Sequence, residues 1–134
     1  MKWKSFFMLL FCFILIDYVV ISYNYNMWQK FVERVQTVST GASSLYNKII
    51  YSLIAWFILV LGLYIFVVDK VKSLADCVIW GTLYAFVVYG VFNFTNMAIM
   101  ENVYTPEMAS RDILSGIITT VLALLAYYSL TVAT

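Results

Sequence analysis

The chain alternates between long apolar stretches and short polar connections. A helix needs about 20 mostly apolar residues to cross the hydrocarbon core of a membrane. Four stretches are long enough, and they cover residues 5–23, 45–68, 74–98 and 113–133. The pattern predicts an all-α integral membrane bundle of four transmembrane helices, formed by one domain that covers residues 1–134.

The first apolar stretch has a second interpretation, a cleaved signal peptide. Lys2 and Lys4 would form the basic start of such a peptide. However, no small-x-small cleavage site follows, and the apolar residues continue beyond Asp17. We therefore expect the stretch to remain in the mature protein as a membrane span.

The connection between the first and second stretches contains a predicted amphipathic helix at residues 26–39. Its apolar residues recur at helical spacing, and its charged and amide residues lie mainly on the other side. The segment is too short and too charged to cross a membrane, so we expect it to lie in the membrane interface. Packing against a partner protein is the alternative. The apolar face contains Met27, Trp28, Phe31 and Val35.

The other two connections contain signals for helix starts. The link at residues 69–73 is short, which predicts that the second and third spans are antiparallel neighbours. Ser73 and Asp76 have the spacing of a capping box before the third span. Pro106 and then Glu107 are typical of the first turn of a helix, so a helix should begin there, before the fourth span.

Polar side chains recur on one face of the third span. Tyr89, Asn93 and Asn96 form a stripe that would leave strong hydrogen-bonding groups unmet in lipid. The first and third spans run in the same direction, so Asp17 lies within one or two helical turns of Asn93 in depth. A carboxylate at mid-span costs roughly 2.5–3.5 kcal/mol, so Asp17 should be protonated or hydrogen-bonded. The expected donors are Asn93, Asn96 and either Tyr18 or Tyr89.

These positions predict a polar intramembrane cluster, and two interpretations of it remain open. In the first, the polar groups only hold the helices together, at about 0.6 kcal/mol for each hydrogen bond. In the second, they surround a cavity that opens toward the first and third connections, with the helix at 26–39 as its rim or lid. The cluster would then bind a small solute, a lipid headgroup or a proton. Its members are Asp17, Tyr89, Asn93, Thr95, Asn96 and Asp112.

Composition agrees with a membrane protein and excludes several kinds of function. Hydrophobic residues make up 64% of the chain and charged residues 11%, against about 25% charged residues in soluble domains. The net charge of +1 gives no basic surface for nucleic acid. The chain has no histidine, and Cys12 and Cys77 show no C-x-x-C spacing. We therefore expect no metal, no cofactor and no nucleic-acid partner.

The distribution of Lys and Arg says little about orientation. Lys2, Lys4, Lys70 and Lys72 fall on one side of the predicted membrane, and Lys30, Arg34, Lys48 and Arg111 fall on the other. The positive-inside rule compares such numbers, and here they are equal. The basic start of the chain favours both termini in the cytoplasm.

Taken together, these motifs resemble a family of small four-helix membrane proteins known as domain of unknown function 2177. The family pattern has an aromatic-Asp-Leu-Thr-Asn motif at the end of span three, where Thr95 and Asn96 match. It has an Asp-x-x-Trp-Gly motif at the start of span four, where Asp112 and Gly116 match. Asp17 matches the acid of the family's first span.

The chain departs from the family pattern at two positions. Asn93 stands where the family has an acid, and Ser115 stands where it has a tryptophan. The resemblance covers nearly the whole chain and implies the four-helix fold, but it implies no established activity. Members in bacteria and in large DNA viruses make a viral membrane protein one of the possibilities.

Three kinds of function are compatible with this pattern. The first is a membrane binding or transport module with a polar pocket. The second is a structural or assembly subunit of a larger membrane complex, with other membrane protein chains as partners. The third is an intramembrane enzyme in which Asp17 and Asp112 act as an acid and base pair. We do not favour the enzyme, because the sequence has no positioned nucleophile, Ser-x-x-Lys arrangement or phosphate loop.

Overall fold

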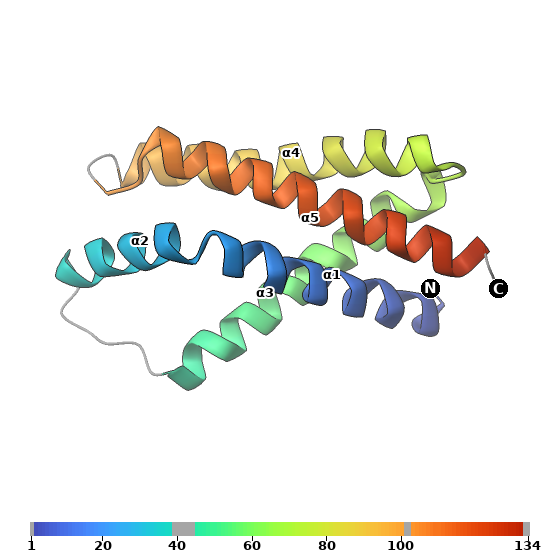
Figure 1. Cartoon of the computed structure of the whole chain (residues 1–134), viewed down its shortest axis with the longest axis horizontal. Helices are drawn as coiled ribbons and strands as arrows, with labels where there is room; N and C mark the ends of the chain where they lie inside the picture. Colours follow the sequence, from blue (N-terminus) through green and yellow to red (C-terminus); the bar gives the residue numbers. More distant parts are fainter. Residues whose placement is uncertain (1, 39–44, 101–102, 133–134) are drawn as a thin grey trace.

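The computed structural model describes residues 2–38, 45–100 and 103–132. This part of the chain contains helices and no strands (Figure 1). Four of the helices are long and apolar enough to cross a membrane, which confirms the all-α class and the four candidate spans. The elements are α1 (Trp3–Tyr23), α2 (Tyr25–Val38), α3 (Leu45–Phe66), the 3₁₀ helix η1 (Val68–Lys70), α4 (Leu74–Ile99) and α5 (Pro106–Val132).

The helix starts follow the capping signals of the sequence. The Asp76 N–H donates to Ser73 Oγ at 3.2 Å, and Ser73 Oγ donates to Asp76 Oδ2 at 2.9 Å, so α4 begins with the predicted pair. At α5, the Met108 N–H donates to Thr105 Oγ1 at 3.3 Å. The helix therefore begins at Pro106, and the predicted start of the span at residue 113 lies inside it. Residue 133, the predicted end, lies outside the described residues.

The bundle is built on an antiparallel pair formed by α4 and α5, which lie side by side in Figure 1. α1 packs against α5, and α3 packs against α1. Small residues allow the first pair to approach closely: a Cβ added at Gly81 of α4 would lie 3.0 Å from Leu124 Cδ1 of α5. The start of α1 and the end of α5 lie at the same end of the bundle.

The position of α3 differs from the expectation for the second span. Despite the short link between them, α3 and α4 do not form a closely packed pair over their length. α3 has its main helical contact with α1 and runs obliquely to α4 in Figure 1. A hydrogen bond joins the two helices, from Tyr84 Oη to the Leu59 carbonyl oxygen at 2.7 Å. Space therefore remains between α3 and α4 on both sides of this bond.

α2 occupies the position of the predicted amphipathic helix, but Figure 1 shows it continuing roughly in the direction of α1. The Asn24 N–H donates to the Val20 carbonyl oxygen at 3.2 Å, and the Asn24 carbonyl oxygen accepts from Met27 N–H at 3.0 Å. Helical hydrogen bonding thus continues almost without interruption between the two helices. The location of α2 in the membrane interface remains a prediction, and residue 39 lies outside the described residues.

The apolar core lies in the half of the bundle that contains the start of α1 and the end of α5. It includes buried side chains from α1, α3, α4 and α5, and both Cys12 and Cys77 are buried free thiols. Large apolar side chains on the outside, such as Phe7, Ile79 and Val91, are more than half exposed, as expected for a surface that faces lipid. The core comprises Phe6, Leu9, Phe13, Val60, Leu63, Val67, Cys77, Ala123, Leu124 and Tyr127.

Candidate functional site: a polar intramembrane cavity

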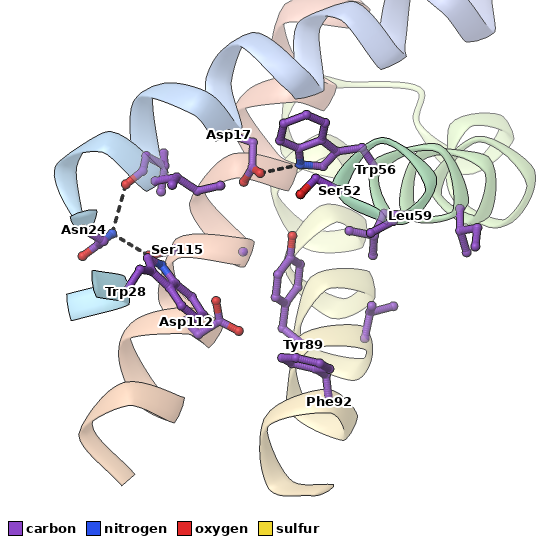
Figure 2. Close-up of a pocket in the computed structure, with 16 residues that line it drawn as sticks. Asp17, Asn24, Trp28, Ser52, Trp56, Leu59, Tyr89, Phe92, Asp112 and Ser115 are labelled. Atoms are coloured by element: carbon purple, nitrogen blue, oxygen red, sulfur yellow. Dashed lines mark hydrogen bonds between the residues drawn. The ribbon is translucent and has the colours of Figure 1, made fainter. Parts of the chain in front are cut away.

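A cavity of about 590 Å³ lies in the other half of the bundle, and residues from α1, α2, α3, α4 and α5 line it (Figure 2). Most of its wall is apolar. Two carboxylic acids, Asp17 of α1 and Asp112 of α5, belong to the lining. The other lining residues with polar atoms in their side chains are Asn24, Trp28, Ser52, Trp56, Tyr89 and Ser115.

Asp17 accepts hydrogen bonds from two helices that cross α1. Trp56 Nε1–H of α3 donates to Asp17 Oδ2 at 2.7 Å, and Thr119 Oγ1 of α5 donates to Asp17 Oδ1 at 3.2 Å (Figure 2 shows the first). These bonds occupy two of the roughly four acceptor positions of a carboxylate. The carboxyl group is only partly buried by the protein and belongs to the cavity wall.

The donors expected for Asp17 were therefore wrong. Asn93 is engaged elsewhere, and Tyr18 is 67% exposed on the outside of α1. The physical reason is the crossing of α3 over α1, which places Trp56 beside the carboxylate. The sequence held one signal for this contact: tryptophan usually lies near the ends of spans, and a tryptophan well inside a span needs an acceptor for its N–H.

Asn93 is the centre of a separate, closed network. Its side chain is fully buried. Its Nδ2 donates to Asp112 Oδ2 and to the Tyr89 carbonyl oxygen, both at 2.7 Å. Its Oδ1 accepts from Tyr104 Oη, which comes from the connection between α4 and α5. The amide thus joins both helices and their connection at one point.

Tyr104 is the member of this network that lies outside the spanning helices. Its side chain is 2% exposed. Burial, and to a smaller extent the charge of Asp112, raises the pKa of Tyr104 to about 12. The phenol therefore keeps its proton at physiological pH and remains a donor to Asn93.

Asp112 and Tyr89 connect the closed network to the cavity. Asp112 is 8% exposed, accepts from Asn93 and lines the cavity. The Tyr89 hydroxyl points into the cavity in Figure 2. The Tyr89 ring packs so closely against Gly116 that a Cβ at this glycine would overlap it. Because residue 116 is a glycine, α5 has no side chain there, and the Tyr89 ring can pack against its backbone.

Asn24 fixes the junction of α1 and α2 to α5. Its Nδ2 donates to Ser115 Oγ at 2.9 Å and to the Val20 carbonyl oxygen at 3.2 Å (Figure 2). This junction holds Trp28, in the first turns of α2, at the edge of the cavity. Neither Asn24 nor Ser115 was among the predicted cluster residues, although Ser115 is one of the two departures from the family pattern.

The other described residues that were predicted for the polar cluster and for the amphipathic helix do not line the cavity, apart from Trp28. Thr95 is exposed and Asn96 is half-buried, and neither lines the cavity. Met27 packs on a small cluster formed by Tyr104, Met108 and Ala109, so the start of α2 contacts the bundle itself. The side chains of Phe31 and Val35 lie outside the part of the molecule that the structure describes.

The described residues contain no group of three or more His, Cys, Asp or Glu side chains that could hold a metal ion. Asp17 and Asp112 are the acids at the cavity, and they come from two different helices. The chemistry available there is hydrogen bonding and the attraction of a positive charge, within mostly apolar walls.

Four apolar helices and a polar centre define the chain as a multi-pass integral membrane protein, with the lipid bilayer as its environment. It belongs to the family described as "Predicted membrane protein (DUF2177)", whose model matches residues 2–129. This match confirms the resemblance found in the sequence. No curated protein and no solved structure matches the chain.

Proposed function

We propose that this membrane protein binds a small amphiphilic ligand whose head group is cationic or donates hydrogen bonds. The observation that supports the proposal is the position of Asp17 and Asp112 in one largely apolar cavity of about 590 Å³. This volume is in the usual range of ligand pockets, about 300–1,000 Å³. Ionisable groups inside a membrane are costly and generally mark functional sites.

The composition of the wall selects the chemistry of the ligand. Leu59, Val88 and Phe92 provide apolar surface for a hydrocarbon portion. In either protonation state the two carboxyl groups accept hydrogen bonds, and in the ionised state they also attract a positive charge and repel an anion. A lipophilic amine combines both properties, and so does a lipid with an amine in its head group.

The rim of the cavity supports entry from the bilayer. Ser52, Ala55 and Ile58 of α3 and Phe92 of α4 line the cavity and are also exposed. A ligand dissolved in the membrane could therefore enter between α3 and α4 without crossing the apolar core. This opening differs from the one expected toward the two connections, although Trp28 of α2 does lie at the edge.

A structural or assembly subunit is the competing function. The closed network around Asn93 supports it, because that network joins helices and needs no ligand. In that case Asp17 would also serve only to join α1 to α3 and α5. The two functions make opposite predictions for the effect of Asp17 on ligand binding.

The test uses three probes with the same hydrocarbon chain: octylamine, octanol and octanoate. Their binding to the purified protein in a neutral detergent is measured by calorimetry and by the change in tryptophan fluorescence, to which Trp28 and Trp56 at the cavity contribute. We expect the amine to bind most tightly and octanoate most weakly. Asp17→Asn should weaken amine binding about tenfold, which corresponds to about 1.4 kcal/mol, and should leave octanol binding nearly unchanged.

Asp69→Asn is the matched control, because Asp69 is exposed in the link after α3 and does not line the cavity. It should bind octylamine as the wild-type protein does. A thermal melt of each variant shows whether it is folded. Equal binding of the three probes, or unchanged amine affinity in a folded Asp17→Asn protein, would contradict the proposal and favour the structural function.

A further inference from the structure

Besides the polar cavity, the bundle has an apolar groove on its outside, between α3 and α4. Its volume is about 490 Å³. Gly62, Phe66 and Val67 form part of its wall on the side of α3, and Leu83 and Val87 do so on the side of α4. The groove lies beside the hydrogen bond from Tyr84 to Leu59 and is distinct from the acidic part of the first cavity.

The groove has a positive end. Lys70, which follows α3 in η1, is the charged residue among those that line it. The Lys70 ammonium lies 4.5 Å from the centroid of the Trp80 ring. A cation–π contact of this kind favours a defined position for a long, flexible side chain. The charge is therefore held at the mouth of the groove.

The length of the groove fits one leaflet of a bilayer. On α4 the lining extends from Trp80 to Val88, which is about 12 Å at a rise of 1.5 Å per residue. The hydrocarbon core of one leaflet is about 15 Å thick. An acyl chain that starts near Lys70 would follow the groove through most of its own leaflet.

We propose that this groove is a binding site for an anionic phospholipid, with one acyl chain between α3 and α4 and the phosphate at Lys70. The positive charge of Lys70 and the long apolar shape of the groove both fit an anionic phospholipid. The groove is apolar along its length and cationic at one end, and the surrounding medium is lipid. Basic residues beside grooves between spanning helices are a common means of holding lipid head groups.

Other charges in the same link do not line the groove. Asp69 and Lys72 are exposed and outside the lining. Asp76 accepts from the Lys72 N–H at 3.0 Å and from Ser73 Oγ, so it is occupied at the start of α4. Selection for an anionic lipid therefore depends on Lys70 rather than on the net charge of the link.

The test compares phosphatidylglycerol with phosphatidylcholine that has the same acyl chains. The whole protein is incubated with each lipid in mild detergent, and retained lipid is counted by native mass spectrometry. We expect about fivefold tighter binding of phosphatidylglycerol, the factor that one lysine near a membrane surface provides. Lys70→Gln should remove this preference, while Lys72→Gln, two residues away and outside the groove, should keep it.

A second pair of variants tests the groove itself. Leu83→Trp fills the groove and should reduce retention of both lipids, while Ile79→Trp, one turn earlier on the exposed face of α4, should not. Equal effects of Lys70→Gln and Lys72→Gln would show a general effect of surface charge and overturn the site. Unchanged retention in Leu83→Trp would place the acyl chain elsewhere and overturn it as well.

Discussion

The bundle has two polar centres, one around Asn93 and one around Asp17, and they differ in how far the protein encloses them. Asn93 is fully buried, and its amide is hydrogen-bonded on both sides by Asp112 and Tyr104. Asp17 is bonded by Trp56 and Thr119, yet its carboxyl group belongs to the wall of a cavity. The amide of the first centre is hydrogen-bonded within the protein, whereas the carboxyl group of the second borders an open cavity.

The packing of the helices explains the difference. α4 and α5 form a close antiparallel pair, so their polar side chains meet directly across a narrow interface. α3 crosses α1 and does not pack closely along α4, so the side chains between them face an open volume. Similar polar residues thus join two helices in one place and line a candidate binding site in the other.

The largest expected effect is that of Asn93→Leu. The substitution removes the amide that donates to the buried Asp112 carboxylate and accepts from Tyr104 Oη. A buried carboxylate that loses such a donor costs about 1–3 kcal/mol, so we expect the free energy of unfolding to fall by about that amount. Unfolding by sodium dodecyl sulfate in mixed micelles measures it.

Asn96→Leu provides the control for this substitution, because Asn96 is half-buried on the same helix and outside the network. Its effect should stay below about 1 kcal/mol. Equal losses in the two variants would mean that the Asn93 network contributes no special stability, and the contrast between the two centres would lose its basis.

A smaller effect is expected from two adjacent threonines of α5. Both are fully buried, but Thr119 donates to Asp17, while the Thr120 hydroxyl has no hydrogen-bond partner among the described residues. Valine has nearly the same shape as threonine. Thr119→Val should lower the free energy of unfolding by about 1 kcal/mol, and Thr120→Val should leave it unchanged or raise it slightly.

The same unfolding measurement in mixed micelles compares these two variants. A loss of stability in Thr120→Val that equals the loss in Thr119→Val would indicate that packing, rather than the hydrogen bond to Asp17, determines the result. The Asp17 centre would then be closer in character to a simple packing site.

The smallest expected effect is spectroscopic and concerns Tyr104. The pKa of this phenol is raised to about 12 in the folded protein, compared with about 10 for an ordinary tyrosine. Its contribution to stability is therefore complete below about pH 10 and is lost as the pH rises through about 12. The difference in phenolate absorbance between wild type and Tyr104→Phe should show a midpoint near pH 12, and a midpoint near pH 10 would mean that the phenol is not buried in the network.

Periodicity and capping signals were sufficient to predict the helices but not their contacts. The apolar stretches located four candidate spans, and Ser73, Asp76 and Pro106 located two helix starts. The stripe on α4 correctly indicated an inward face for Asn93. Each of these properties depends on residues that are close together in the sequence.

The partners of Asp17 could not be predicted in the same way. A helical stripe shows which side of a helix is polar, but it does not show which neighbouring helix that side meets or at what crossing angle. Trp56 reaches Asp17 only because α3 crosses α1, and Ser115 reaches Asn24 only because α5 lies beside the junction of α1 and α2. These contacts depend on the assembly of the whole bundle.

The long separation in sequence between Asp17 and its donors has a consequence for biogenesis. Trp56 follows Asp17 by 39 residues and Thr119 follows it by 102. The ribosome therefore delivers the acid first, its indole partner later and its hydroxyl partner only when α5 is made. Until then the first helix carries an incompletely solvated acid into the membrane. Insertion machinery should therefore retain the nascent chain until α5 has entered.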